Sequence, residues 1–137
     1  MKYFHAVFPP FNVERQLHIN ALELLSVLVG LRLWAPLSQG QGVQIYCDNQ
    51  TSVQVLNSGR SKDEYLCVCL RDIAFICAVN RLELRALHIE GASNRLSDFL
   101  SRSHLQSDNL ARFLLEVGQS MQFTSAADSV FHLTDAW

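Results

Sequence analysis

The stretch VQIYCDNQTSV, residues 43–53, contains the change of pattern that decides the fold. Its first five residues, Val43–Cys47, are an apolar run that is typical of a buried strand. Asp48-Asn49 follows as a polar turn. Residues 50–57 (QTSVQVLN) then predict a short helix, which Ser58-Gly59 ends. The predicted strand and helix therefore meet at a turn that contains an acid. Strands and helices continue to alternate upstream and downstream of this stretch.

The flanking sequence continues this alternation. Upstream, residues 2–8 (KYFHAVF) are aromatic and β-branched and stop at Pro9-Pro10, which predicts a strand. From Asn20 to Trp34 apolar residues recur at helical spacing, and a proline follows where a helix should have ended. The other expected elements are a helix over Lys62–Val79, a strand over Leu82–Ile89, and helices over Leu96–Ser103 and Asn109–Val117. The tail is ambiguous between a strand and loose structure. Helices that alternate with short strands indicate an α/β fold with a partly parallel sheet.

Length and composition limit the number of domains and the type of partner. The 137 residues fit one compact domain, and 49% hydrophobic with 18% charged residues is a globular balance that excludes a disordered chain. A net charge of −2 excludes nucleic-acid binding by overall positive charge. Any affinity for nucleic acid must therefore come from a local group of cations. The cations close in sequence to the candidate site residues are Arg60, Lys62, Arg95 and Arg102, and cations scattered in this way more often form a solvated surface.

Cysteine usage and hydropathy indicate the compartment. Cys47, Cys67, Cys69 and Cys77 lack the spacing of a zinc site and lie in apolar runs, which favours reduced, buried thiols in an intracellular protein. No apolar run reaches the roughly 18 residues of a membrane span, and the N-terminus has no signal-peptide core. We expect a cytoplasmic or nuclear protein with no membrane partner.

Three carboxylates are candidate site residues, and each has an ordinary structural explanation. Glu23 looks toward the apolar side of its helix, but Asn20 to Glu23 fits the spacing of a capping box. Asp48 stands at the carboxyl end of a buried strand, where ligands gather in open α/β sheets, but it is also a suitable N-cap for the next helix. Asp98 lies in the first turn of a helix, where the helix dipole favours an acid.

The three acids carry more weight together. An acid at a strand end, another on the preceding helix and a third on a late helix can meet at one edge of the sheet. Converging carboxylates repel one another and lose hydration, so such a cluster normally implies a divalent cation. Mg²⁺ is the natural candidate, with Mn²⁺ as a substitute, because it prefers hard oxygen ligands and phosphate.

Several segments resemble the ribonuclease H domains of retrotransposons, most closely the DIRS type. They are HINALELLSVLVGL (18–31), VQIYCDNQTSV (43–53), the helix over 62–79, and LRALHIEGASNRLSDFLSR (84–102) with its pattern HI-x-G-x-x-N-x-x-x-D-x-L-S-R. The resemblance implies a ribonuclease H-like α/β fold, with a mixed sheet flanked by helices. It places a truncated domain at 1–103 and a C-terminal helical extension and tail of the same domain at 104–137.

The resemblance also implies roles for named residues. The family's second, third and fourth metal-binding acids match Glu23, Asp48 and Asp98. In similar domains the positions of Asn49, Thr51 and Ser52 lie near the bound strand's backbone, where helix amides receive phosphate well. Arg60, Asn94 and Arg95 complete the nucleic-acid-binding set. His88 is expected to have a structural role, because the family's catalytic-loop histidine does not map onto it.

One departure from the family lies upstream. The family begins with a central strand that carries the first aspartate, and this sequence starts beyond it. Val43–Cys47 is therefore expected to have an open edge, which natural proteins cover. A second copy could pair there, another polypeptide could supply the strand, or the tail could fold back, with Ser129–Leu133 as a strand and Asp128 or Asp135 as an acid.

These expectations leave competing functions. The first is magnesium-dependent hydrolysis of RNA in RNA–DNA hybrids, impaired by loss of the first aspartate, with specificity from hybrid shape and the 2′-hydroxyls. The second is a catalytically inactive, retroelement-derived module that binds nucleic acid or dimerises. The third is a structural protein-binding domain whose three acids stabilise helix ends.

Overall fold

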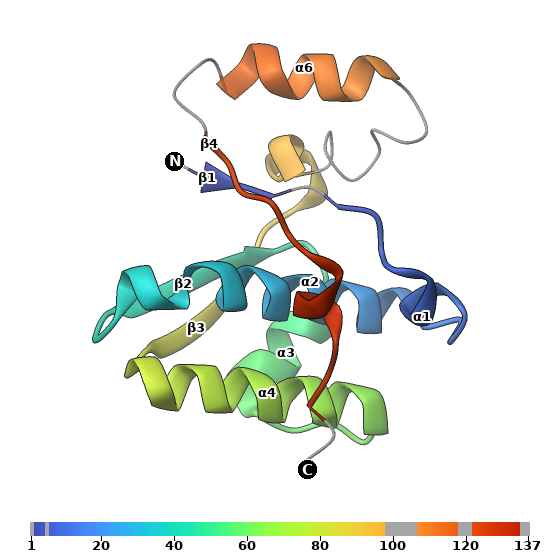
Figure 1. Cartoon of the computed structure of the whole chain (residues 1–137). Helices are drawn as coiled ribbons and strands as arrows, with labels where there is room; N and C mark the ends of the chain where they lie inside the picture. Colours follow the sequence, from blue (N-terminus) through green and yellow to red (C-terminus); the bar gives the residue numbers. More distant parts are fainter. Residues whose placement is uncertain (1, 5, 98–106, 118–121, 135–137) are drawn as a thin grey trace.

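The computed structural model is of mixed α/β type, as the sequence predicts, and it describes residues 2–4, 6–97, 107–117 and 122–134 (Figure 1). The strands are β1 (Lys2–Tyr3), β2 (Gly42–Cys47), β3 (Glu83–His88) and β4 (Gln122–Phe123). The α-helices are α1 (Pro10–Val13), α2 (Ile19–Trp34), α3 (Gln50–Ser58), α4 (Glu64–Asn80) and α6 (Ser107–Val117), and the 3-10 helices are η1 (Ala35–Ser38), η2 (Gly91–Ser93) and η4 (Asp128–Phe131). Of the helix predicted over Leu96–Ser103, residues 96 and 97 are helical, and the remainder lies outside the described residues.

β2 and β3 form the parallel pair at the centre of the fold. Gly42 lies opposite Glu83 and Cys47 lies opposite His88. Both strands were predicted, and α3 and α4 supply the long crossover that parallel strands require (Figure 1). The expected mixed sheet is not found in the described part of the chain, where each sheet consists of two parallel strands.

The hydrophobic core lies between α2 and α4. On α2, Leu24, Leu25, Leu28 and Val29 are fully buried, at the spacing that puts side chains on one helix face. α4 contributes the facing residues Leu66, Cys69, Leu70 and Ile73. The helix predicted from Asn20 to Trp34 is thus confirmed, and it is the main core element.

The strand predicted over residues 2–8 is wrong for most of its length. Of the described residues 2–4 and 6–8, only Lys2–Tyr3 forms a strand, and it pairs with β4 instead of the central pair. Beyond it, aromatic side chains pack on neighbouring helices: the Phe4 ring lies 5.6 Å from that of Trp34, and the Phe8 ring lies 5.9 Å from that of Phe131. The aromatic residues whose composition predicted a strand therefore pack against the hydrophobic core instead.

The later part of the tail covers α2, whereas Gln122–Phe123 supplies the short strand β4, which pairs with β1 and not with β2. Ser129–Leu133 was a candidate strand, but Asp128–Phe131 is the 3-10 helix η4. Figure 1 shows η4 lying across α2, with the chain continuing toward α4. Phe131 is buried there, Asp128 is exposed, and Asp135 lies outside the described residues. The expectation that the tail completes the sheet is therefore wrong for the described residues.

A buried ion pair fixes the tail to the core. Arg32 Nη2 lies 3.0 Å from Asp72 Oδ2, and Asp72 is 3% exposed. Arg32 Nη1 also donates to Val130 O at 2.7 Å, and the Thr134 amide donates to Asp72 Oδ2 at 2.9 Å. The pair thus ties α2 and α4 to backbone groups near the C-terminus.

The outer edge of β3 is closed by a side chain. Asn57 Nδ2 donates to Ala86 O, and the Ala86 amide donates to Asn57 Oδ1, both at 2.9 Å. The amide side chain of α3 thereby occupies the groups that a further strand would use.

The outer edge of β2, unlike that of β3, has backbone groups that pair with no described strand. Cys47 O accepts from the Ile89 amide, so it faces β3. Because backbone groups alternate in direction along a strand, those of Gln44 and Tyr46 point to the other edge. No described strand pairs with that edge, as the sequence analysis expects.

One segment of the described chain, Ile19–Ser38, is long and apolar enough to cross a membrane by length and composition alone. It coincides with α2 and η1. Here its most apolar face is buried against α4 as the core of the domain, which is a common reason for such a composition.

Candidate metal centre

Three potential metal ligands converge where β2 ends. The carboxylates of Glu23 and Asp48 and the thiol of Cys47 each offer one ligand atom, and these atoms all lie within 4.8 Å of one another. Glu23 reaches the site from α2 and is partly buried, Cys47 is the buried last residue of β2, and Asp48 follows it on the surface. The structure therefore brings together two of the three predicted acids.

Neither acid is used as a helix cap. The N-cap of α2 is His18, whose Nδ1 accepts from the Asn20 amide at 3.1 Å. The N-cap of α3 is Asn49, whose Oδ1 accepts from the Ser52 amide at 2.8 Å. The capping explanations for Glu23 and Asp48 are therefore wrong, and among the described residues neither acid has a cationic partner in an ion pair.

A hydrogen bond between two asparagines fixes the distance between the two elements. Asn49 Nδ2 donates to Asn20 Oδ1 at 2.9 Å, which joins the first turn of α2 to the turn after β2. The hydrogen bond thus links the helix that carries Glu23 to the turn that carries Asp48. The Asn49 side chain was predicted to lie near nucleic acid, but here its amide and carbonyl groups both serve the fold.

The neighbouring residues that were predicted to bind nucleic acid differ in their exposure to solvent. Thr51 is partly buried in the first turn of α3, whereas Ser52 is 1% exposed. The contact predicted for Thr51 and Ser52 rests on backbone amides at the start of α3, and the burial of the Ser52 side chain does not test it. Arg60 is exposed in the loop after α3, where a phosphate could reach it.

The segment after β3 passes beside Asp48. A side-chain carbon added at Gly91 would lie 3.8 Å from Asp48 Oδ2, and His88 Nε2 lies 3.3 Å from Asp48 O. This contact supports the structural role expected of His88. It also brings the segment that continues to Asp98 up to the cluster, although Asp98 itself lies outside the described residues.

The remaining predicted residues lie a little further along this segment. The Asn94 amide donates to Glu90 O at 3.2 Å, which closes the turn. Arg95 is exposed, and its guanidinium pairs with Glu116 of α6. That pairing competes with the phosphate contact predicted for Arg95.

The cluster has the electrostatics of a cation site. Burial raises the pKa of the Glu23 carboxyl above its ordinary value of 4.5, and the Asp48 carboxylate raises it further. Burial also raises the pKa of the Cys47 thiol, and both carboxylates add to this effect. A divalent cation would relieve the repulsion and favour the charged form of each ligand.

Cys47 is the site residue that sequence reasoning missed. All four cysteines were treated as small hydrophobic residues. The available signal was position: the last residue of a buried strand, directly before an acid, lies at the edge where ligands gather.

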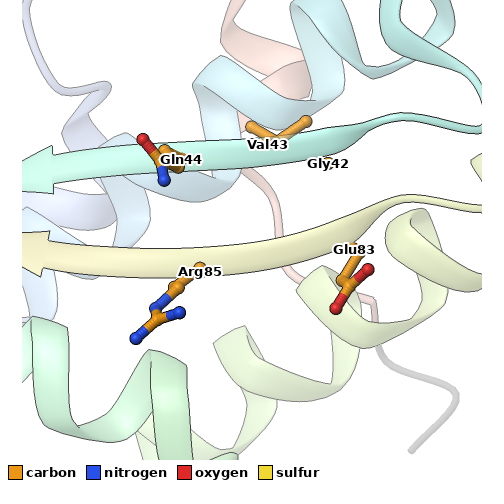
Figure 2. Close-up of a pocket in the computed structure, with 5 residues that line it drawn as sticks. All are labelled: Gly42, Val43, Gln44, Glu83 and Arg85. Carbon is orange, nitrogen blue, oxygen red and sulfur yellow. The ribbon is translucent and has the colours of Figure 1, made fainter.

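A shallow depression elsewhere on the surface is separate from this cluster. Figure 2 shows it over the first residues of β2 and β3, with Glu83 and Arg85 projecting from the same strand. Its lining residues are Gly42, Val43, Gln44, Glu83 and Arg85. The cluster lies at the other end of the strands.

Comparison of the chain with protein-family models, curated proteins and solved structures finds no match.

Proposed function

We propose that this chain is a ribonuclease H-like domain of retroelement type whose centre at Glu23 and Asp48 binds Mg²⁺ and acts on the RNA of RNA–DNA hybrids. The observation that carries the proposal is the convergence of two carboxylates at the end of a parallel strand, with neither acid capping a helix. The ligand atoms of the two acids lie within 4.8 Å of each other, so a shared cation would relieve their mutual repulsion.

The donor set fits the proposed cation. Mg²⁺ prefers carboxylate oxygens and retains several waters, so two protein carboxylates are a reasonable share of its ligands. Glycine at position 91 leaves space beside Asp48 Oδ2. When bound, the cation would supply an activated water and neutralise the leaving oxygen of a phosphodiester. Asp98 is the further ligand that the resemblance implies.

Two exposed cations follow the C-terminal end of α3, whose N-terminal end adjoins the cluster. Arg60 and Lys62 are both exposed in the loop between α3 and α4. With a net charge of −2, binding must depend on such local cations and on the shape of the hybrid. Affinity should therefore fall steeply as salt rises.

The proposal is tested with a labelled RNA–DNA hybrid, Mg²⁺ or Mn²⁺, and two variants. Asp48→Asn removes a ligand charge with little change in shape, and Glu64→Gln removes an exposed acid in the first turn of α4 as a control. Cleavage by the native chain that is lost in Asp48→Asn and kept in Glu64→Gln is the expected result. Cleavage that survives Asp48→Asn, or that needs no divalent cation, would contradict the proposal.

The second candidate is an inactive module that dimerises or binds nucleic acid, and the free edge of β2 favours it. Pairing of two copies at Gln44 and Tyr46 would cover backbone groups that the described chain leaves open. Gln44→Pro removes one outward N–H at an edge where proline is tolerated, and Gln44→Thr keeps it. Light scattering should then show a dimer for the native chain and Gln44→Thr and a monomer for Gln44→Pro. A monomer in all three, without hybrid cleavage or binding, would rule this candidate out.

A further inference from the structure

We infer that the centre is a mixed thiolate and carboxylate site, in which Cys47 is a third ligand and Zn²⁺ binds more tightly than Mg²⁺. This inference deepens the proposed function, because it concerns the same cation site and rests on it. It changes the class of cation from a hard ion to a borderline one, and it makes Zn²⁺ a competitor of Mg²⁺.

The first support is distance. A four-coordinate Zn²⁺ with ordinary Zn–S and Zn–O bond lengths holds its ligand atoms about 3.5 Å apart. The Cys47 sulfur and the carboxylate oxygens of Glu23 and Asp48 already lie within 4.8 Å of one another. Small rotations of the two acid side chains would close the difference. Three protein ligands then leave a fourth position for water or a phosphate oxygen.

The second, independent support is a buried hydroxyl beside the thiol. Ser52 is 1% exposed, and its Oγ forms no hydrogen bond of standard geometry within the described residues. The hydroxyl lies beside the Cys47 sulfur, as does the Asn49 backbone N–H. Buried hydroxyls normally have a partner. A metal-bound thiolate would provide the acceptor that Ser52 lacks.

The other cysteines do not share this arrangement. The Cys67 thiol donates to Ser61 O at 3.0 Å, and Cys69 is fully buried in the core. Burial raises the pKa of Cys69 to about 12, and the nearby Asp72 carboxylate adds to this effect. Within the part of the chain that the structure describes, Cys47 alone among the four lies within 4.8 Å of two carboxylates that could share a cation with it.

The binding step is a simple exchange. The divalent cation forms a bond to the Cys47 sulfur, the S–H bond breaks, and the proton passes to solvent. Each carboxylate donates an oxygen lone pair and displaces a water from the cation. No oxidant or reductant is required, because neither the metal nor the sulfur changes oxidation state.

The test uses Co²⁺ as a spectroscopic substitute for Zn²⁺ on the full chain. The native protein should show the near-ultraviolet charge-transfer band of a Co²⁺–thiolate bond, and Zn²⁺ should abolish it at stoichiometric amounts while excess Mg²⁺ does not. Cys47→Ser should lose the band, and Cys77→Ser should keep it. Ser52→Ala should keep the band but weaken Co²⁺ affinity by about 10- to 100-fold, as loss of a supporting hydrogen bond does in other metal sites.

A second measurement covers the case in which Cys47→Ser does not fold. In the native chain, Zn²⁺ should protect Cys47 from alkylation and leave the rate at Cys67 unchanged, as mapped by mass spectrometry.

The outcomes separate the two proposals. Co²⁺ binding that depends on Asp48 but shows no thiolate band, with no protection of Cys47, would overturn the inference and leave the proposed cation site standing. No binding of Co²⁺, Mn²⁺ or Mg²⁺ would overturn both. A thiolate band without hybrid cleavage would support the inference and count against the catalytic proposal alone.

Discussion

Replacing Glu23 with glutamine should stabilise the metal-free protein at neutral pH. The substitution keeps the shape of the side chain and removes a charge that is partly buried and within 4.8 Å of the Asp48 carboxylate. At that distance Coulomb's law gives a repulsion of about 3.5 kcal/mol at an effective dielectric constant of ~20, and of about 0.9 kcal/mol in bulk water. Because Asp48 is exposed, we expect Glu23→Gln to raise the free energy of unfolding by about 1 to 3 kcal/mol.

The pH dependence of this gain has a definite sign. The folded-state pKa of Glu23 lies above its ordinary value of 4.5. Its contribution to stability is therefore fully present below about pH 4.5 and is lost as the pH rises through the folded-state pKa. The advantage of Glu23→Gln should be smallest in acid and reach its full value once native Glu23 is ionised.

Urea unfolding of both proteins in a chelator, at about pH 4 and about pH 8, measures the effect. At the higher pH, Glu23→Gln should also unfold at a temperature several degrees above the native chain. Adding Mg²⁺ or Zn²⁺ should stabilise the native chain and leave the variant nearly unchanged, because ligands stabilise only the state that binds them. Glu64→Gln is the control for loss of a surface charge. A gain that is equal at both pH values, or a variant less stable than the native chain at pH 8, would refute the reasoning.

Three further substitutions test other parts of the structure. Asp72→Ala removes the carboxylate partner of Arg32, whose side chain is 20% exposed and still donates to Val130 O, and should lower the free energy of unfolding by about 1 to 3 kcal/mol in urea; an unchanged free energy would show that the ion pair adds nothing to stability in solution. Asn57→Ala should cost about 1 to 3 kcal/mol and promote aggregation seen by light scattering, because it exposes the Ala86 backbone groups; a soluble variant of native stability would contradict the closed edge. Gly91→Leu should weaken divalent-cation affinity measured by calorimetry, because its side chain would occupy the space beside Asp48, while Gly91→Ala should bind nearly as well as native; equal affinity in all three would mean that this loop lies away from the site.

The central strands and helices could be predicted because their patterns are local. Val43–Cys47 and Leu82–Ile89 are short apolar or alternating segments bounded by polar turns and glycine, and both contain strands. The burial predicted for Val43–Cys47 is wrong except at Cys47, because exposed and partly buried residues alternate along β2. The helix from Asn20 to Trp34 differs from its prediction by one residue at the start.

The errors arise where tertiary packing outweighs local propensity. Residues 4–8 have strand-like composition, but the rings of Phe4 and Phe8 gain more by packing on the core than by pairing at a sheet edge. The tail was ambiguous because nothing near Val130 in the sequence reveals that its carbonyl binds Arg32, 98 residues away.

The candidate site could be predicted only in part, because local patterns place some of its residues and tertiary packing places the others. Glu23 and Asp48 could be paired from strand-end position and helix phase. Their capping alternatives failed because His18, two residues before the expected cap Asn20, and Asn49, next to the expected cap Asp48, take those roles. The distance between Cys47 and Glu23 depends on how α2 packs against β2, and no local sequence pattern determines that packing.

The anchor between Arg32 and the C-terminal backbone has a consequence for how the protein is made. A ribosome releases residue 32 and residue 72 long before residues 130–134, and Asp72 accepts from the Thr134 amide. Until that last segment emerges, the two helices on either side of the core hold a charge pair that lacks part of its native surroundings. The nascent chain should therefore resist proteases fully only after residue 134 has left the ribosome, and ribosome-bound fragments ending before residue 130 should be cut within α2 and α4.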